Sequence, residues 1–181
     1  MEFQVDGFIL YLATERGLST AYQLSVRQTL DKLVEWTSKQ GYKEWRDLGT
    51  DELSAFLGHL RKGDRDASSL RIALVHLKIF FRFLQNRNHI EIDPAEPLLA
   101  PKTSAKLPET LNAETITQLL SSINPEKKLG KRDLALLELF YASGLRLSEI
   151  CNARLEFLDV DDHFLRITGK GNKTRLVPVG E

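Results

Sequence analysis

A cluster of four prolines sets the strongest limit on how this chain can fold. The prolines are Pro94, Pro97, Pro101 and Pro108. Each proline fixes its own φ and removes a backbone N–H, so no helix can run through the cluster. We therefore expect residues 89–112 to form an extended tether. The domain boundary is placed here, with a helical domain over residues 1–90, a linker over 91–108 and a second domain over 109–181.

The region before the prolines has the apolar spacing of amphipathic helices. Four segments show it: residues 2–14, residues 20–40, the stretch that follows Thr50, and roughly residues 67–88. Ser19 is a suitable N-cap for the second segment, and Gly41 is the residue expected to end it. Thr50 is expected to cap the third. The sequence thus predicts a small bundle of four helices.

The fourth helix is expected to carry a basic face. Arg71, Lys78 and Arg82 are separated by seven and four residues, which places them within a narrow arc of a helix. Two interpretations stay open, an ordinary solvated face and a row of phosphate contacts. The chain as a whole has 25 basic and 25 acidic residues, so its net charge does not decide between them.

Three further helices are expected after the linker. Asn112 is a suitable cap for a helix over 113–122. The segment 131–142 is apolar almost all round, which predicts a centrally buried helix that ends at Gly144. A short helix over 147–153 follows.

The hydrophobic period then changes from 3.6 to 2. The segments HFLRIT (163–168) and TRLVPV (174–179) alternate like strands. The glycine-containing stretch 169–172 between them is typical of a hairpin turn. The C-terminal part is therefore expected to contain both helices and a small β-hairpin.

Two basic residues in this part are candidates for phosphate chemistry. Arg146 follows Gly144 at the start of a short helix, and a guanidinium held there matches two phosphate oxygens. Glu149 lies on the same helical face, so a surface ion pair is the alternative. Lys170 lies between two glycines at the expected turn, and a lysine at a hairpin tip can reach a DNA groove. An ordinary basic hairpin is the alternative there.

Taken together, these segments resemble the tyrosine site-specific recombinases of the phage-integrase type, in particular the bacterial Xer recombinases (XerC/XerD-like). The matching segments are RDLALLELFYASGLRLSEI at 132–150 and GKGNKTRLVPVG at 169–180, with the linker APKTSAKLPETL upstream. The resemblance implies a mainly α protein. Its parts would be a SAM-like, four-helix core-binding domain, a proline-rich linker, and the incomplete α+β start of a catalytic domain with a small β-hairpin.

The family's mechanism implies roles for particular residues. A tyrosine attacks a DNA phosphodiester, forms a 3′-phosphotyrosyl link and needs no metal or cofactor. Arg146 would clamp the scissile phosphate, Lys170 would protonate the leaving 5′ oxygen, and Glu149 would support the site. The implied DNA contacts are Arg71, Lys78, Arg82, Lys173 and Arg175.

The resemblance also implies partners and a setting. Double-stranded DNA would be the substrate, bound by a tetramer of this protein or of this protein with a related recombinase. Chromosome-dimer resolution and DNA integration are both possible roles. The sequence shows neither a signal peptide nor an apolar run of the ~20 residues that a membrane span needs, so a cytoplasmic location away from membranes is expected.

The sequence departs from the family in one large respect. The H-x-x-R motif and the late nucleophilic tyrosine of the family do not occur, and the four tyrosines all precede Arg146. We therefore expect the 181-residue chain alone to be inactive in DNA cleavage. A non-catalytic DNA-binding remnant of a recombinase is the alternative, and a helical scaffold without a DNA role is a weaker one.

Overall fold

The computed structural model describes residues 1–62, 66–101, 109–169 and 173–179. The chain divides into two compact units, Met1–Lys106 and Leu107–Glu181, which we call the helical unit and the C-terminal unit. None of the described helices is long and apolar enough to cross a membrane.

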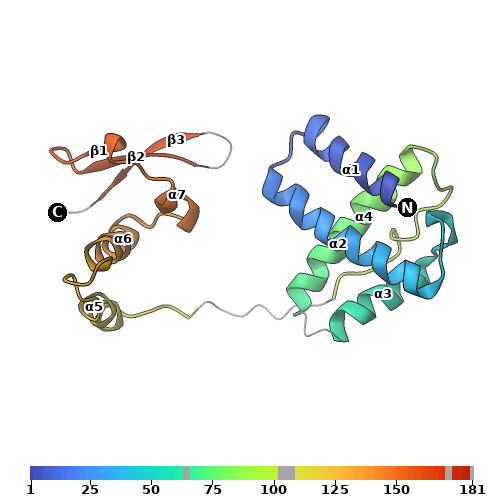
Figure 1. The fold of residues 1–181 in the computed structure, drawn as a ribbon, viewed down its shortest axis with the longest axis horizontal. Coiled ribbons are helices and arrows are strands. Elements are labelled where there is room, and N and C mark those ends of the chain that lie inside the picture. Colours follow the sequence, from blue (N-terminus) through green and yellow to red (C-terminus); the bar gives the residue numbers. More distant parts are fainter. Residues whose placement is uncertain (63–65, 102–108, 170–172, 180–181) are drawn as a thin grey trace. The chain divides into compact units, whose positions relative to one another are not determined.

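The helical unit contains the four expected helices (Figure 1). They are α1 (Glu2–Thr14), α2 (Thr20–Gln40), α3 (Thr50–Lys62) and α4 (Ala67–Asn86), with a 3-10 turn at Trp45–Asp47 between α2 and α3. Helix α4 packs against each of the other three. The four-helix prediction is therefore confirmed, with α4 as the central element.

The ends of α2 agree with the sequence, whereas the start of α3 does not. The Ser19 hydroxyl accepts a hydrogen bond from the Tyr22 N–H at 3.4 Å, and Gly41 ends α2 with a left-handed φ of 87°. Thr50 was expected to cap α3 but is its first residue. Its hydroxyl instead donates to the Pro94 carbonyl at 3.0 Å, because the segment after α4 passes close to the start of α3.

Aromatic side chains form the centre of the helical core. The Phe80 ring on α4 lies 5.3 Å from that of Phe8, 4.9 Å from that of Trp45 and 5.5 Å from that of Phe81, measured between ring centroids. Tilted and edge-on pairs of this kind add to the free energy gained by burying the rings. Helices α1 and α4 and the turn after α2 are thus joined through one side chain.

The segment after α4 differs from the extended tether that the prolines predict. Ile90, Ala95 and Leu98 are buried in the same core as the four helices. Proline excludes a helix but does not exclude burial, and these apolar side chains provide the surface that binds the segment to the bundle. The part of the proline-rich region up to Leu98 is therefore packed on the helical unit.

The C-terminal unit combines helices with a small antiparallel sheet (Figure 1). Its helices are α5 (Ala113–Ser121), α6 (Gly130–Ser143) and α7 (Leu147–Cys151), followed by a 3-10 turn at Leu155–Phe157. Its strands are β1 (Leu158–Asp159), β2 (Phe164–Thr168) and β3 (Thr174–Pro178), in the order β1-β2-β3. The expected hairpin of β2 and β3 is confirmed, and β1 was not predicted.

Register and burial show which face of the sheet is covered. Leu165 on β2 pairs with Val177 on β3, and both side chains are buried together with Ile167. Phe164, Arg166 and Leu176 belong to the alternate positions and are exposed. The sheet therefore packs one face on the helices, as the period of two predicts.

The expectation that residues 131–142 form a centrally buried helix is wrong for the described structure. The apolar side chains of α6 are half-buried, and Tyr141 near its end is 60% exposed. Helices α5 and α7 and strand β3 pack against α6, and together they cover only part of its surface. An apolar helix becomes central only when other elements surround it.

We expect Phe80→Ala to destabilise the helical unit by about 3–5 kcal/mol, because it removes a fully buried ring and leaves a cavity. Urea unfolding followed by tryptophan fluorescence measures this loss, since Trp36 and Trp45 both lie in the helical unit. Phe3→Ala is the matched control, because Phe3 is 82% exposed and its loss should change stability by less than ~0.5 kcal/mol. Equal effects of the two substitutions would contradict the assignment of Phe80 to the core.

Candidate functional site

The turn after α6 places Arg146 at the start of α7. Gly144 ends α6 with a left-handed φ of 59°, a conformation that glycine adopts without strain. Leu145 is then buried in the core, which anchors the chain immediately before the arginine. Arg146 follows in an extended conformation as the N-cap of α7, and its side chain is 71% exposed. The backbone is held, and the guanidinium is open to solvent.

The Glu149 carboxylate holds Arg146 through two hydrogen bonds. The Arg146 backbone N–H donates to Glu149 Oε2 at 2.8 Å, which satisfies a donor at the helix start. The Arg146 guanidinium donates to Glu149 Oε1 at 3.1 Å. The side chain of Glu149 is only 4% exposed, so the carboxylate lies beneath the arginine rather than beside it in solvent.

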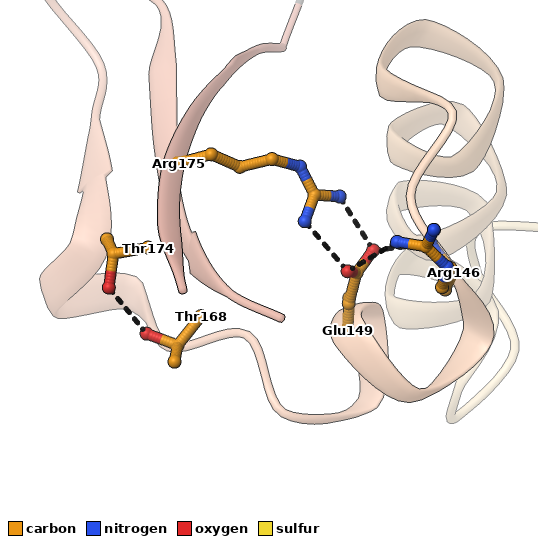
Figure 2. A network of polar contacts seen from close by, with 5 residues as sticks. All are labelled: Arg146, Glu149, Thr168, Thr174 and Arg175. Atoms are coloured by element: carbon orange, nitrogen blue, oxygen red, sulfur yellow. Dashed lines mark hydrogen bonds and ion pairs between the residues drawn. The ribbon is translucent and has the colours of Figure 1, made fainter. Parts of the chain in front are cut away.

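A second arginine binds the same carboxylate from the sheet. Arg175 on β3 donates from Nη1 to Glu149 Oε1 at 2.8 Å and from Nη2 to Glu149 Oε2 at 2.9 Å. Figure 2 shows the two guanidinium groups approaching Glu149 from opposite sides, one from β3 and one from the start of α7. This paired geometry is the strong form of the arginine–carboxylate interaction. It joins the hairpin to α7.

The electrostatics of the cluster follow from these four hydrogen bonds. Donation from Arg175 and from the Arg146 backbone lowers the pKa of Glu149 from its usual 4.5 to about 2, against the opposing effect of burial. The carboxylate is therefore ionised at neutral pH. Two guanidinium groups and one carboxylate leave a net charge of +1, with Arg146 facing solvent. Such an arrangement can bind an oxyanion.

A glycine that sequence reasoning treated only as part of a turn is packed against this cluster. A Cβ atom at Gly169 would lie 2.9 Å from Arg175 Nη1 and 2.9 Å from Glu149 Oε1. The Gly169 N–H also donates to the Lys173 carbonyl at 2.9 Å and closes the base of the hairpin. The only hint in the sequence was that Gly169 and Arg175 lie on either side of the expected hairpin turn. That spacing does not predict the ion pair between Arg175 and Glu149.

The other predicted site residues are distributed differently. Lys170 lies outside the described residues. Lys173 is exposed just before β3. On α4 of the helical unit, Arg71 and Arg82 are exposed, whereas Lys78 is half-buried and its ammonium donates to the Glu96 carbonyl at 3.0 Å. The structure thus brings Arg146, Glu149 and Arg175 together.

Among the side chains that the structure describes, no group of three or more histidine, cysteine, aspartate or glutamate residues could hold a metal ion.

Comparison with known proteins assigns both units to one family. The sequence profile described as "Phage integrase, N-terminal SAM-like domain" matches residues 5–88, and the profile described as "Phage integrase family" matches residues 109–181. The chain belongs to the phage integrase family. Within the phage integrases it is similar to the Xer-type tyrosine recombinases, as the resemblance of the sequence motifs indicates.

Similar sequences support this placement. The chain is 38% identical over 181 residues to tyrosine recombinase XerC of Pseudomonas aeruginosa (strain LESB58), with 100% of this chain and 60% of that protein covered. It is 39% identical over 176 residues to tyrosine recombinase XerC of Xylella fastidiosa (strain M23), with 97% and 60% covered. The chain thus spans 60% of the length of these relatives.

Solved structures of phage integrases share the fold. A lambda integrase dimer bound to a COC′ core site matches 98% of this chain and 62% of that chain, with a TM-score of 0.76 and 20% identity. The Tn1549 transposon integrase in complex with circular intermediate DNA matches 98% and 61%, with a TM-score of 0.69 and 16% identity. At this level of identity the likeness concerns the fold, and it confirms the predicted fold class.

The depressed pKa of Glu149 predicts a pH-dependent contribution to stability. The folded-state pKa of about 2 lies below the usual 4.5, so the stabilisation is present above about pH 4.5 and is lost as the pH falls towards 2. Glu149→Gln should lower the melting temperature of the C-terminal unit at pH 7. The difference from the unsubstituted protein should shrink between pH 4.5 and 2. Thermal unfolding followed by NMR signals of β2 and β3 measures it.

The control for this experiment is Glu156→Gln. Glu156 pairs with Arg154 at the surface, where ion pairs contribute little to stability. A constant difference between Glu149→Gln and the unsubstituted protein at every pH would contradict the buried, ionised carboxylate.

Proposed function

We propose that the intact protein is an Xer-type tyrosine recombinase that cuts and rejoins double-stranded DNA through a 3′-phosphotyrosyl intermediate. The observation that carries the proposal is the position of Arg146. Its guanidinium is held by a buried carboxylate and remains 71% exposed. A fixed and accessible guanidinium is what binding of a scissile phosphate requires. The proposal also rests on 38% identity to a tyrosine recombinase along the whole chain.

In this proposal, three residues of the C-terminal unit have separate tasks. Arg146 binds the non-bridging oxygens of the scissile phosphate and stabilises the charge that develops there. Lys170 is the general acid for the leaving 5′ oxygen. Glu149 holds Arg146 in place. Its hydrogen bonds with Arg175 also connect the site to the hairpin on which Lys170 is expected. Neither a metal nor another cofactor is needed, because the phosphotyrosyl bond conserves the energy of the cleaved one.

Contacts to the DNA backbone are proposed at the exposed basic residues. Arg71 and Arg82 on α4 and Lys173 before β3 are accessible to phosphates. Arg175 keeps 42% of its side chain exposed while it binds Glu149, so we propose a phosphate contact for it as well. Lys78 belongs to the same predicted row, but it is half-buried and its ammonium donates to the Glu96 carbonyl.

The proposed setting follows from the relatives. The chain is similar to XerC proteins, and solved structures of similar fold show lambda integrase as a dimer bound to a COC′ core site and as a tetramer bound to a Holliday junction. We propose that this protein assembles as a tetramer on DNA, with itself or a related recombinase. We place it in the cytoplasm, where it resolves chromosome dimers or integrates DNA.

Binding of duplex DNA should weaken steeply as salt is added, with a slope in log K against log salt of about −0.9 for each phosphate contact. Arg82→Ala should reduce affinity for all sequences to a similar extent and lower this slope by about one. Fluorescence anisotropy at several salt concentrations measures both. Lys39→Ala is a suitable control, because Lys39 pairs with Glu35 at the surface of α2. Binding without salt dependence would contradict the proposal.

Arg146→Ala should reduce strand cleavage by about 10²–10³-fold in a version of the protein extended to the length of its relatives, because one fixed donor to the developing charge is lost. Covalent protein–DNA adducts on a suicide substrate measure the cleavage. Arg154→Ala is the control, since Arg154 pairs with Glu156 at the surface.

The same assay separates the two candidate functions. The 181-residue chain, whose four tyrosines all precede Arg146, is expected to form no adduct. If the extended version also forms none while both bind DNA, the non-catalytic DNA-binding role becomes the better assignment. Near-normal cleavage by Arg146→Ala would remove this arginine from the site.

A further inference from the structure

The segment that follows α4 is built as a strap on the helical unit. We use the name strap for residues 88–98. The chain turns at Asn88, whose φ of 57° is left-handed, and Ile90 and Leu98 are buried in the core. Between them Asp93 is buried, and its carboxylate accepts a hydrogen bond from the Ala95 N–H at 2.8 Å. A short turn with a buried carboxylate therefore shapes the middle of the strap.

Two helices hold the strap by its carbonyl groups. The Thr50 hydroxyl at the start of α3 donates to the Pro94 carbonyl at 3.0 Å. The Lys78 ammonium in the middle of α4 donates to the Glu96 carbonyl at 3.0 Å. The two carbonyls are two residues apart, so side chains from α3 and α4 fix the same short piece of backbone. Its position relative to both helices is thereby determined.

Lys78 differs from the other members of the predicted basic row. Arg71 and Arg82 are exposed, whereas Lys78 is half-buried. Its ammonium donates to a backbone oxygen, the Glu96 carbonyl, in a hydrogen bond at 3.0 Å that lies at the surface. A hydrogen bond from a charged donor is stronger than one between neutral groups. The helical spacing that places the three residues in one row therefore does not imply one role.

We infer that Lys78 is a positioning residue, which fixes the point where the chain between the two units leaves the helical unit, and that it is not a phosphate contact. Helix α4, which carries the proposed phosphate contacts Arg71 and Arg82, would then also fix the position where the chain between the two units begins. When two linked units bind one ligand, the segment between them loses conformational entropy. That loss is smaller if the first residues of the segment are already fixed before binding. The part of the inference that concerns DNA rests on the proposed function.

Amide hydrogen exchange of the 181-residue chain tests the positioning role without DNA. Lys78→Met keeps the aliphatic stem and removes the donor. The reporter is the Leu98 N–H, which donates to the Ala95 carbonyl at 3.2 Å inside the strap. We expect its exchange to become about five- to tenfold faster, as the loss of one hydrogen bond at the surface implies. Thr50→Val, which removes the second tie, should accelerate the same amide.

Arg82→Met is the matched control, because Arg82 lies one turn further along α4 and is exposed. It should leave exchange at Leu98 unchanged. Unchanged exchange in Lys78→Met would overturn the inference, whatever the DNA measurements show. Because this arm needs no DNA, its result stands even if the proposed recombinase function fails.

The salt dependence of duplex binding tests the second half of the inference. Lys78→Met should leave the slope of log K against log salt at its original value, whereas Arg82→Met should lower it by about one. A decrease of about one in Lys78→Met would show that Lys78 contacts a phosphate and would overturn the assignment. Equal slopes in all variants, together with faster exchange in Lys78→Met, would support the positioning role and remove Arg82 from the proposed contacts.

Discussion

A single buried carboxylate connects the elements of the candidate site. Glu149 accepts hydrogen bonds from the backbone and side chain of Arg146 and from both terminal nitrogens of Arg175. Burying this charge would be unfavourable without partners, and the two guanidinium groups supply them. The start of α7 and strand β3 are consequently held at a defined separation, and Gly169 leaves the space that the pair occupies. The accessible position of Arg146 depends on this arrangement.

The helical unit depends in a similar way on one element, although through apolar contacts. Helix α4 packs on α1, α2 and α3, and Phe80 contributes the side chain on which aromatic rings from other segments converge. The opposite side of α4 carries the exposed Arg71 and Arg82. One helix therefore combines the centre of the core with a basic surface, and Lys78, on the same side as Arg71 and Arg82, holds the strap through the Glu96 carbonyl. Stability and proposed DNA binding are thus linked through α4.

Sequence reasoning was most accurate where structure is decided by neighbouring residues. The bounds of α1 and α2, the Ser19 cap, the left-handed Gly41 and Gly144, and the pairing of β2 with β3 all follow from spacing of a few residues. The strap and α6 were interpreted wrongly because burial depends on what else is nearby. Prolines in the strap exclude a helix without excluding packing, and the apolar α6 is only partly covered by its neighbours.

The sequence by itself determined the helical bundle, the hairpin, the family and the position of Arg146 at the start of a short helix, because periodicity and motifs are local properties of the chain. Only the tertiary structure decided which charges meet. Glu149 and Arg175 are 26 residues apart, and Lys78 and Glu96 are 18 apart. Contacts at such separations depend on how strands and helices pack. For this reason Arg175 and Lys78, which the sequence presented as similar basic side chains, have different partners.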